Sequence, residues 1–135
     1  MHSTRSGRFS FREEYERTIA YFMQQSAQVS AHRVIGYYEG QHAQMVEDDL
    51  QAWAAREYNA THLQVELCQP LPSSPYSEYQ YETLAALCTR WARKYGFPLD
   101  REHIKGHDEI PPGIREGKTD PGRMFDWNRL LALVL

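Results

Sequence analysis

The sequence predicts an α/β domain, in which helices surround a small mixed β-sheet. Residues 78–95 repeat apolar side chains at helical spacing, which indicates one long amphipathic helix. Residues 29–47 predict two strands joined by a turn at Glu39–Gly40, and residues 62–68 alternate in the manner of a third strand. One long helix combined with a few strands and further helices favours a layered α/β fold.

Length and composition indicate a single soluble domain over residues 1–135. The chain is 41% hydrophobic and 24% charged, and its formal net charge is −3. No apolar run approaches the roughly 18 residues of a membrane-spanning helix, and the N-terminal residues lack the apolar core of a signal peptide. Without a dense Lys/Arg stripe, we expect no nucleic-acid partner. Cys68 and Cys88 lack a metal-binding CxxC spacing, so we expect two reduced thiols, although their number also allows one disulfide.

A first helix is expected from Phe11 to about residues 25–27. Its apolar side chains recur at spacings of three and four and share one face: Phe11, Tyr15, Ile19, Phe22 and Met23. Ser10 and Glu13 form an S-x-x-E pattern, which predicts a capping box at its start.

The predicted strand at residues 62–68 carries a carboxylate in its middle. Glu66 lies on the face opposite to Leu63, Val65 and Leu67. A carboxylate is costly to bury without partners, so Glu66 either lines a polar cleft or forms a buried ion pair. The pattern leaves both readings open.

The helix at residues 78–95 has signals at both ends. Ser77 and Gln80 predict a capping box, and Gly96 predicts the C-terminal stop. Its apolar stripe consists of Leu84, Leu87, Cys88, Trp91, Ala92 and Tyr95. We also expect a loop or short helix at residues 48–57, a short strand at residues 103–106, and a closing helix that carries Trp127, Leu130, Leu131 and Val134.

The stretch from Ile104 to Trp127 concentrates the residues suited to chemistry. His107 precedes Asp120 by thirteen residues, and Lys118 precedes that aspartate by two. Histidine and aspartate are good zinc ligands, and a nearby lysine can neutralise an oxyanion. The prolines and glycines between them predict a stiff loop. The rest of the chain must supply a third ligand, a general base and a cleft.

Several motifs, in the same order along nearly the whole chain, resemble one family, the zinc-dependent N-acetylmuramoyl-L-alanine amidases. This family includes phage endolysins and bacterial wall-recycling amidases, and it shares its fold with peptidoglycan recognition proteins. The motifs are HSTRSG (2–7), VSAHRVIG (29–36), HLQVEL (62–67) and GHDEIPPG…GKTDPGRMFDW (106–127). The last is the most specific.

The resemblance implies a fold, a metal site and a reaction. The fold would be a central mixed β-sheet flanked by helices, with one zinc ion in a groove at one side. The implied zinc ligands are His2, His107 and Asp120; Glu66 matches the general base and Lys118 the group that stabilises the transition state. The implied reaction is hydrolysis of the amide bond between N-acetylmuramic acid and L-alanine in peptidoglycan or muropeptides.

Three further positions match the family's substrate groove. His32 matches a Ser-x-His position and is expected as a groove or supporting residue, the alternative being a core histidine. Trp53 and Asn59 match groove positions loosely, and this chain has Trp53-Ala54-Ala55-Arg56 where the family often has Trp-His-Ala-Gly. The family also has a strand immediately before its first ligand, and we expect this domain to lack that strand.

Two rival functions remain open from the sequence. One is a non-catalytic module of the same fold that binds peptidoglycan or muropeptides, and the other is a zinc hydrolase of unrelated fold, which would place His107 and Asp120 far from Glu66. The filled ligand, Glu and Lys positions favour the amidase. We expect a monomer that is cytoplasmic or is released to the cell wall at lysis.

Overall fold

The structure, a computed structural model, describes residues 1–134. It contains four strands and four α-helices, with three short 3-10 helices (η) between them. In chain order these are β1 (His2–Ser3), α1 (Phe11–Phe22), η1 (Gln25–Ala27), β2 (Arg33–Ile35), β3 (His42–Gln44), η2 (Arg56–Ala60), β4 (Val65–Leu67), α2 (Glu78–Tyr95), η3 (His107–Glu109), α3 (Pro111–Arg115) and α4 (Trp127–Val134).

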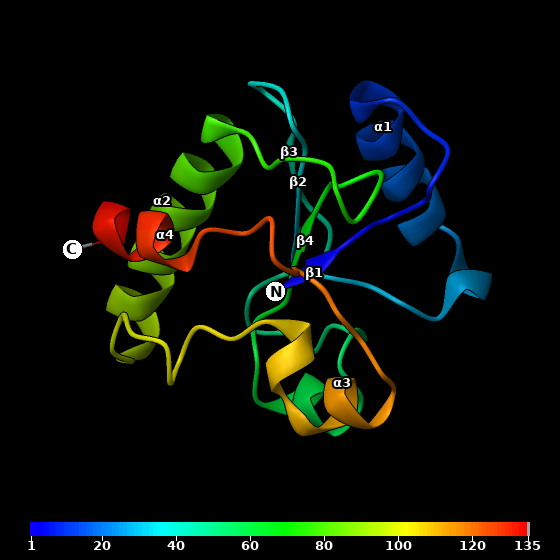
Figure 1. The fold of residues 1–135 in the computed structure, drawn as a ribbon. Helices are drawn as coiled ribbons and strands as arrows, with labels where there is room; N and C mark the ends of the chain where they lie inside the picture. Colours follow the sequence, from blue (N-terminus) through cyan, green and yellow to red (C-terminus); the bar gives the residue numbers. More distant parts are fainter. Residues whose placement is uncertain (135) are drawn as a thin grey trace.

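The four strands form one mixed sheet in the order β1-β4-β2-β3. Strands β1, β4 and β2 are parallel, and β3 pairs antiparallel with β2. The register places His2 and Val34 on either side of Glu66, so these three side chains share one face. In Figure 1, α2 and α4 lie on one side of this sheet, α1 on the other, and α3 below its lower end. The predicted mixed α/β fold is confirmed.

The main core lies between the sheet and the pair α2 and α4. Ile35, Val65 and Leu67 supply the sheet side, and Leu84 and Leu130 are fully buried on the helices. The bounds predicted for α2 are confirmed, as are its Ser77/Gln80 capping box and the left-handed Gly96 (φ 75°) at its end. Both cysteines are free and buried.

The predicted apolar stripe of α2 is wrong at its last position. Tyr95 is 41% exposed, and its hydroxyl donates to the carboxylate of Asp49 at 2.6 Å. The phenol therefore lies on the polar rim of the core, where its hydroxyl keeps a partner.

Helix α1 begins at the predicted residue, and its predicted apolar face is partly buried except at Met23. Ser10 accepts from the Glu13 amide, while the Glu13 carboxylate accepts from the Ser10 hydroxyl and not from its backbone. Met23 is 73% exposed, whereas Glu14 is only 1% exposed. The Glu14 carboxylate accepts hydrogen bonds from Thr4, Ser6 and the Ser6 amide, so it fastens the segment that follows β1.

The predicted strands are confirmed at their centres and are shorter than expected. Residues 29–32 and 62–64 lie outside the ladder because other groups take their backbone bonds; for example, the Gln64 amide donates to the His32 ring at 2.9 Å. Residues 48–55 form a loop, and η2 follows it.

The predicted strand at residues 103–106 is wrong. The backbone amides of His103 and Ile104 both donate to the Asp100 carbonyl, which closes a turn there. The loop expected between His107 and Asp120 instead contains η3 and α3. Helix α3 begins with Pro111 and Pro112, whose fixed φ suits the first turn of a helix.

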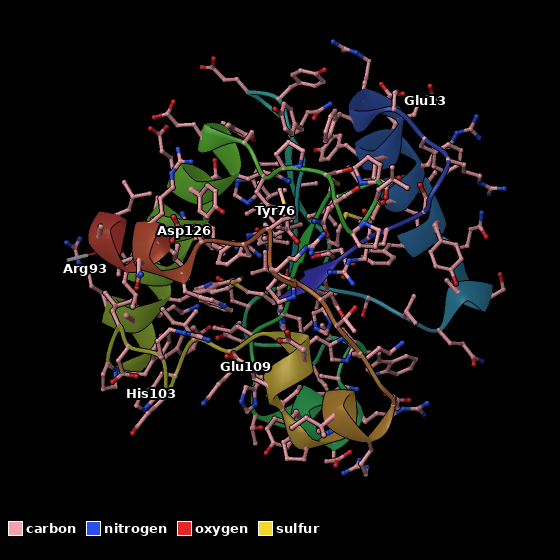
Figure 2. The ribbon with its side chains drawn as sticks, in the orientation of Figure 1. Glu13, Tyr76, Arg93, His103, Glu109 and Asp126 are labelled. Atoms are coloured by element: carbon pink, nitrogen blue, oxygen red, sulfur yellow. The ribbon has the colours of Figure 1, made fainter. Side chains whose placement is uncertain are left out.

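Buried and exposed side chains are clearly separated in space. Tyr76, labelled in Figure 2, lies at the centre of the molecule, whereas Glu13 and Arg93 project from the outer sides of α1 and α2. Within residues 1–134, no helix has both the length and the apolar character that crossing a membrane requires.

Candidate metal centre and active site

Three side chains from distant parts of the chain converge beside the edge strand β1. His2 belongs to β1, His107 begins η3, and Asp120 follows α3. The Nδ1 atoms of the two histidines are 3.1 Å apart, and His107 Nδ1 lies 3.3 Å from Asp120 Oδ1. One potential ligand atom from each residue lies within 4.8 Å of the others, and all three residues are buried. The geometry brings together the three residues that the resemblance implied as ligands.

Backbone contacts hold His107 and Asp120 in place relative to each other and to β1. The His107 amide donates to the Met1 carbonyl at 2.9 Å, and the Asp108 amide donates to the Asp120 carbonyl at 3.0 Å. Gly113 packs against the same segment so closely that a Cβ atom there would lie 1.7 Å from the His107 carbonyl oxygen. Only glycine fits at that position, which explains part of the Pro-Pro-Gly sequence.

Asp120 is oriented by a second set of contacts. Its Oδ2 accepts from the Ser3 amide at 3.0 Å. The Tyr76 hydroxyl donates to the Pro121 carbonyl at 2.8 Å and is hydrogen-bonded to the Ser3 hydroxyl. These bonds connect the strand that carries His2 to the loop that carries Asp120.

The protonation of the cluster suits a divalent cation. Burial holds the pKa of His2 well below its ordinary value, so the ring is neutral at neutral pH. Burial by itself would raise the pKa of Asp120, but the contacts with His107 and the Ser3 amide outweigh it, and the pKa lies below its usual value. Neutral imidazole and ionised carboxylate are the forms that bind zinc, so this donor set fits a catalytic zinc site with two His and one Asp.

Glu66 lies next to His2 on the same face of the sheet. It is half-buried, and within residues 1–134 no ion pair is formed with it, which favours the polar-cleft reading over the buried ion pair. Burial raises the pKa of Glu66 to about 8, and the negative charge of Asp120 acts in the same direction. The positive charges of the N-terminus and, more weakly, of the exposed Lys118 act against them.

A cavity of about 680 Å³ opens beside the two histidines. Its walls include Leu63, Trp91 and Ile110, together with His32 and Asn59. His32 is 1% exposed and uses both ring nitrogens inside the protein, toward the Leu50 carbonyl and the Gln64 amide. This arrangement suits the supporting role expected for His32, and contact with a substrate stays a prediction.

Trp53 lies in the loop before η2, Asn59 lies in η2, and the two side chains differ in their surroundings. The Trp53 side chain is 55% exposed, and it is not among the residues that line the cavity. The Asn59 side-chain oxygen accepts from the amides of Ala54 and Ala55 at 3.0 and 2.7 Å, so it shapes the loop. Their predicted roles in substrate binding stay predictions.

Sequence reasoning missed Gln64 and the ion pairs that tie η2 to α3. Gln64 lies two positions before Glu66, immediately before β4, and its Oε1 lies 2.7 Å from His2 Nε2. Alternation along the strand could have pointed to it, but its partner is 62 positions away. Arg56 pairs with Glu116 at 2.7 Å, and Arg115 pairs with Glu57 at 2.6 Å.

Comparison with known proteins gives one family. The model of the Amidase_2 family, described as N-acetylmuramoyl-L-alanine amidase, matches residues 1–123. The 1,6-anhydro-N-acetylmuramyl-L-alanine amidase AmpD of Enterobacter cloacae is 34% identical over 71% of this chain and 52% of its own length. The AmpD of Citrobacter freundii is 35% identical, over 78% of this chain and 57% of its own.

Two further matches extend this comparison. The N-acetylmuramoyl-L-alanine amidase A of Achromobacter lyticus is 28% identical over 89% of this chain and 76% of its own. A crystal structure of a selenomethionine derivative of AmpD superposes with a TM-score of 0.68 at 35% identity, covering 79% of this chain and 60% of that one. The chain thus spans about half the length of the first curated relatives that it matches.

Proposed function

This chain belongs to the N-acetylmuramoyl-L-alanine amidase family, and from that premise we propose that it hydrolyses the amide bond between N-acetylmuramic acid and L-alanine in peptidoglycan or muropeptides. The observation that carries the proposal is the convergence of His2, His107 and Asp120 beside Glu66. The family's activity needs a metal site and a proton carrier, and these side chains can supply both.

The proposed cofactor is one zinc ion, held by His2, His107 and Asp120. Bound there, zinc would polarise the scissile carbonyl and lower the pKa of water. The Ser3 amide donates to the Asp120 carboxylate, and the Met1 carbonyl accepts from the His107 amide, so these two residues are held in place before any ion binds.

Glu66 would move the proton in the reaction. It takes a proton from the attacking water as the water oxygen bonds to the amide carbon, and it returns that proton to the nitrogen as the carbon–nitrogen bond breaks. Burial raises its pKa in the metal-free chain, which favours return of the proton to the leaving nitrogen, and the charge of a bound zinc ion would favour the ionised form that accepts it. Lys118, exposed at the mouth of the loop, would face the oxyanion that develops on the amide carbonyl.

The substrate class follows from the names of the relatives. Two of them are named for 1,6-anhydro-N-acetylmuramyl-L-alanine, and a third for N-acetylmuramoyl-L-alanine. We propose that this chain accepts the muramoyl–alanine amide that these names share. We also infer that it acts as a monomer, either in the cytoplasm or at the cell wall after lysis.

The test measures zinc binding and release of alanine amino groups from muropeptides and from purified peptidoglycan. The expected result is one zinc per chain and amine release from at least one substrate. His107→Ala should lose both, whereas His42→Ala, a matched change at an exposed histidine on β3, should keep both. Zinc and muropeptide binding without amine release would instead establish the binding module. Failure to bind zinc would contradict both readings.

A further inference from the structure

We propose that Gln64 is a positioning residue for His2, which it holds in the one tautomer that leaves Nδ1 free for a metal. The proposal rests on the proposed function, because it assigns a supporting role at the same metal site. Gln64 is buried and forms part of the cavity wall beside His2.

The contact itself determines where the proton lies on His2. Gln64 Oε1 lies 2.7 Å from His2 Nε2, and both residues are buried. An amide oxygen can only accept, so Nε2 carries the hydrogen and Nδ1 keeps its lone pair. That Nδ1 lies 3.1 Å from His107 Nδ1 and 3.9 Å from Asp120 Oδ2, at the centre of the candidate metal site. A hydrogen-bond partner at the ring nitrogen that does not bind the metal generally fixes the tautomer and orientation of a ligand histidine.

Two hydrogen bonds to His32 hold the backbone of Gln64 in place. The Gln64 amide donates to His32 Nδ1 at 2.9 Å, and the His32 amide donates to the Gln64 carbonyl at 2.9 Å. His32 Nε2 lies 2.7 Å from the Leu50 carbonyl, which can only accept. His32 therefore has its proton on Nε2 and its lone pair on Nδ1, which agrees with its contact to Gln64.

The three residues thus form a continuous chain of hydrogen bonds that ends at the metal site. It runs from the Leu50 carbonyl through His32 to the Gln64 backbone, and from the Gln64 side chain to His2. The side-chain nitrogen of Gln64, Nε2, is buried and has no hydrogen-bond partner within the described residues. Flipping the side-chain amide of Gln64 would exchange its oxygen and its nitrogen. The nitrogen would then donate to His2 Nε2, and the His2 proton would move to Nδ1, opposite His107.

A leucine at position 64 would keep the volume and remove the acceptor. The His2 Nε2 hydrogen would then be buried without a partner, which disfavours this tautomer and lets the ring turn. A glutamate would keep an oxygen at the same place. The pair Gln64→Leu and Gln64→Glu therefore separates the loss of the hydrogen bond from the loss of packing.

The first experiment is nitrogen-15 NMR of the histidine rings in metal-free protein, with the His2 signals identified by their loss in His2→Gln. Wild type should carry the His2 proton on Nε2. A proton on Nδ1 would overturn the proposal without any variant at position 64.

The second experiment measures the zinc dissociation constant and the melting temperature of each metal-free variant. Gln64→Leu should raise the zinc Kd by about 10- to 100-fold, and Gln64→Glu should restore it to within about threefold of wild type. Gln44→Leu, a matched change at an exposed glutamine on β3, should leave the Kd unchanged. A lower melting temperature of Gln64→Leu with an unchanged Kd and tautomer would make Gln64 a packing residue and overturn the proposal.

These results also separate the two proposals. If wild type binds zinc and shows the Gln64 effects but releases no amine from any muropeptide, the proposed function fails and the role of Gln64 stands. If amine release is present and the Kd does not respond to Gln64→Leu, only the inference about Gln64 fails.

Discussion

The two faces of strand β4 have opposite chemistry, although their residues alternate along one strand. On β4, Val65 and Leu67 enter the apolar core under α2, whereas Glu66 between them faces His2. The apolar face gains its stability from burial, while the polar face holds a charge that burial disfavours. The difference teaches that one strand can serve the fold with one half of its residues and the candidate chemistry with the other half.

The largest expected effect tests the polar face. Glu66→Gln should lower kcat for muropeptide hydrolysis by about 10²- to 10⁴-fold, because the variant cannot carry the proton. Steady-state kinetics at saturating zinc measures this, and the zinc content should stay at one ion per chain. Glu82→Gln, an exposed change on α2, serves as the control. Activity within tenfold of wild type would show that Glu66 is not the base.

The next effect tests the apolar face. Leu84 is fully buried between α2 and the sheet, so Leu84→Ala should reduce the free energy of unfolding by about 2–5 kcal/mol. Denaturant unfolding measures the loss, with Leu71→Ala at an exposed position as the control. The kcat per folded molecule should stay close to that of wild type. A large loss of kcat in fully folded protein would show that the two faces are not separate in function.

A smaller effect links the polar face to stability. The pKa of Glu66 is raised from 4.5 to about 8 in the folded chain, so between these values the folded state binds more protons than the unfolded state. Stability from this group is therefore present at low pH and is lost as pH rises through about 8. In metal-free protein, the free energy of unfolding of Glu66→Gln relative to that of wild type should increase by about 1.5 kcal/mol or more between pH 5 and pH 8.

Parallel urea titrations of the two proteins across this pH range measure the gain. Other titrating groups are common to both proteins and cancel in the difference. A constant difference across the range would mean that Glu66 keeps an ordinary pKa, and the polar face would then be better hydrated than its burial indicates.

The smallest effect concerns a region outside both faces. Arg56 and Glu116 form an exposed ion pair between η2 and α3, and such pairs contribute little because solvent screens them. Arg56→Gln should shift the melting temperature by less than about 2 °C. Differential scanning calorimetry at low and high salt checks this. A shift in melting temperature larger than the one caused by Leu84→Ala would show that this loop contact contributes more to stability than a core side chain does.

The sequence predicted α2 well because its signals are local. Ser77, Gln80 and Gly96 lie within the helix or next to it, and the apolar spacing from Leu84 to Trp91 is confirmed by burial. Helix α3 was missed because it has only five residues, too few to show a helical repeat of apolar side chains. The role of Glu14 was missed for another reason, since its partners Thr4 and Ser6 come from a different segment.

The candidate site also combines residues that are close together in the sequence with residues that are far apart. His107, Lys118 and Asp120 lie in one motif, so the sequence could group them, and the family resemblance added His2 and Glu66. Their proposed roles stay predictions until they are measured. No sequence signal paired Gln64 with His2, because a contact between residues 62 positions apart depends on how β1 and β4 align.

The separation of the three candidate ligands along the chain has a consequence for how the protein would persist in a cell. His2 and His107 are 105 positions apart, so an ion bound between them would close a loop that includes most of the chain. An ion that binds only the folded chain would stabilise that state by mass action, by about 4 kcal/mol when the free metal concentration is a thousandfold above its Kd. The lifetime of the chain against proteases would then follow the supply of metal, and starvation for the ion would remove the protein as well as its activity.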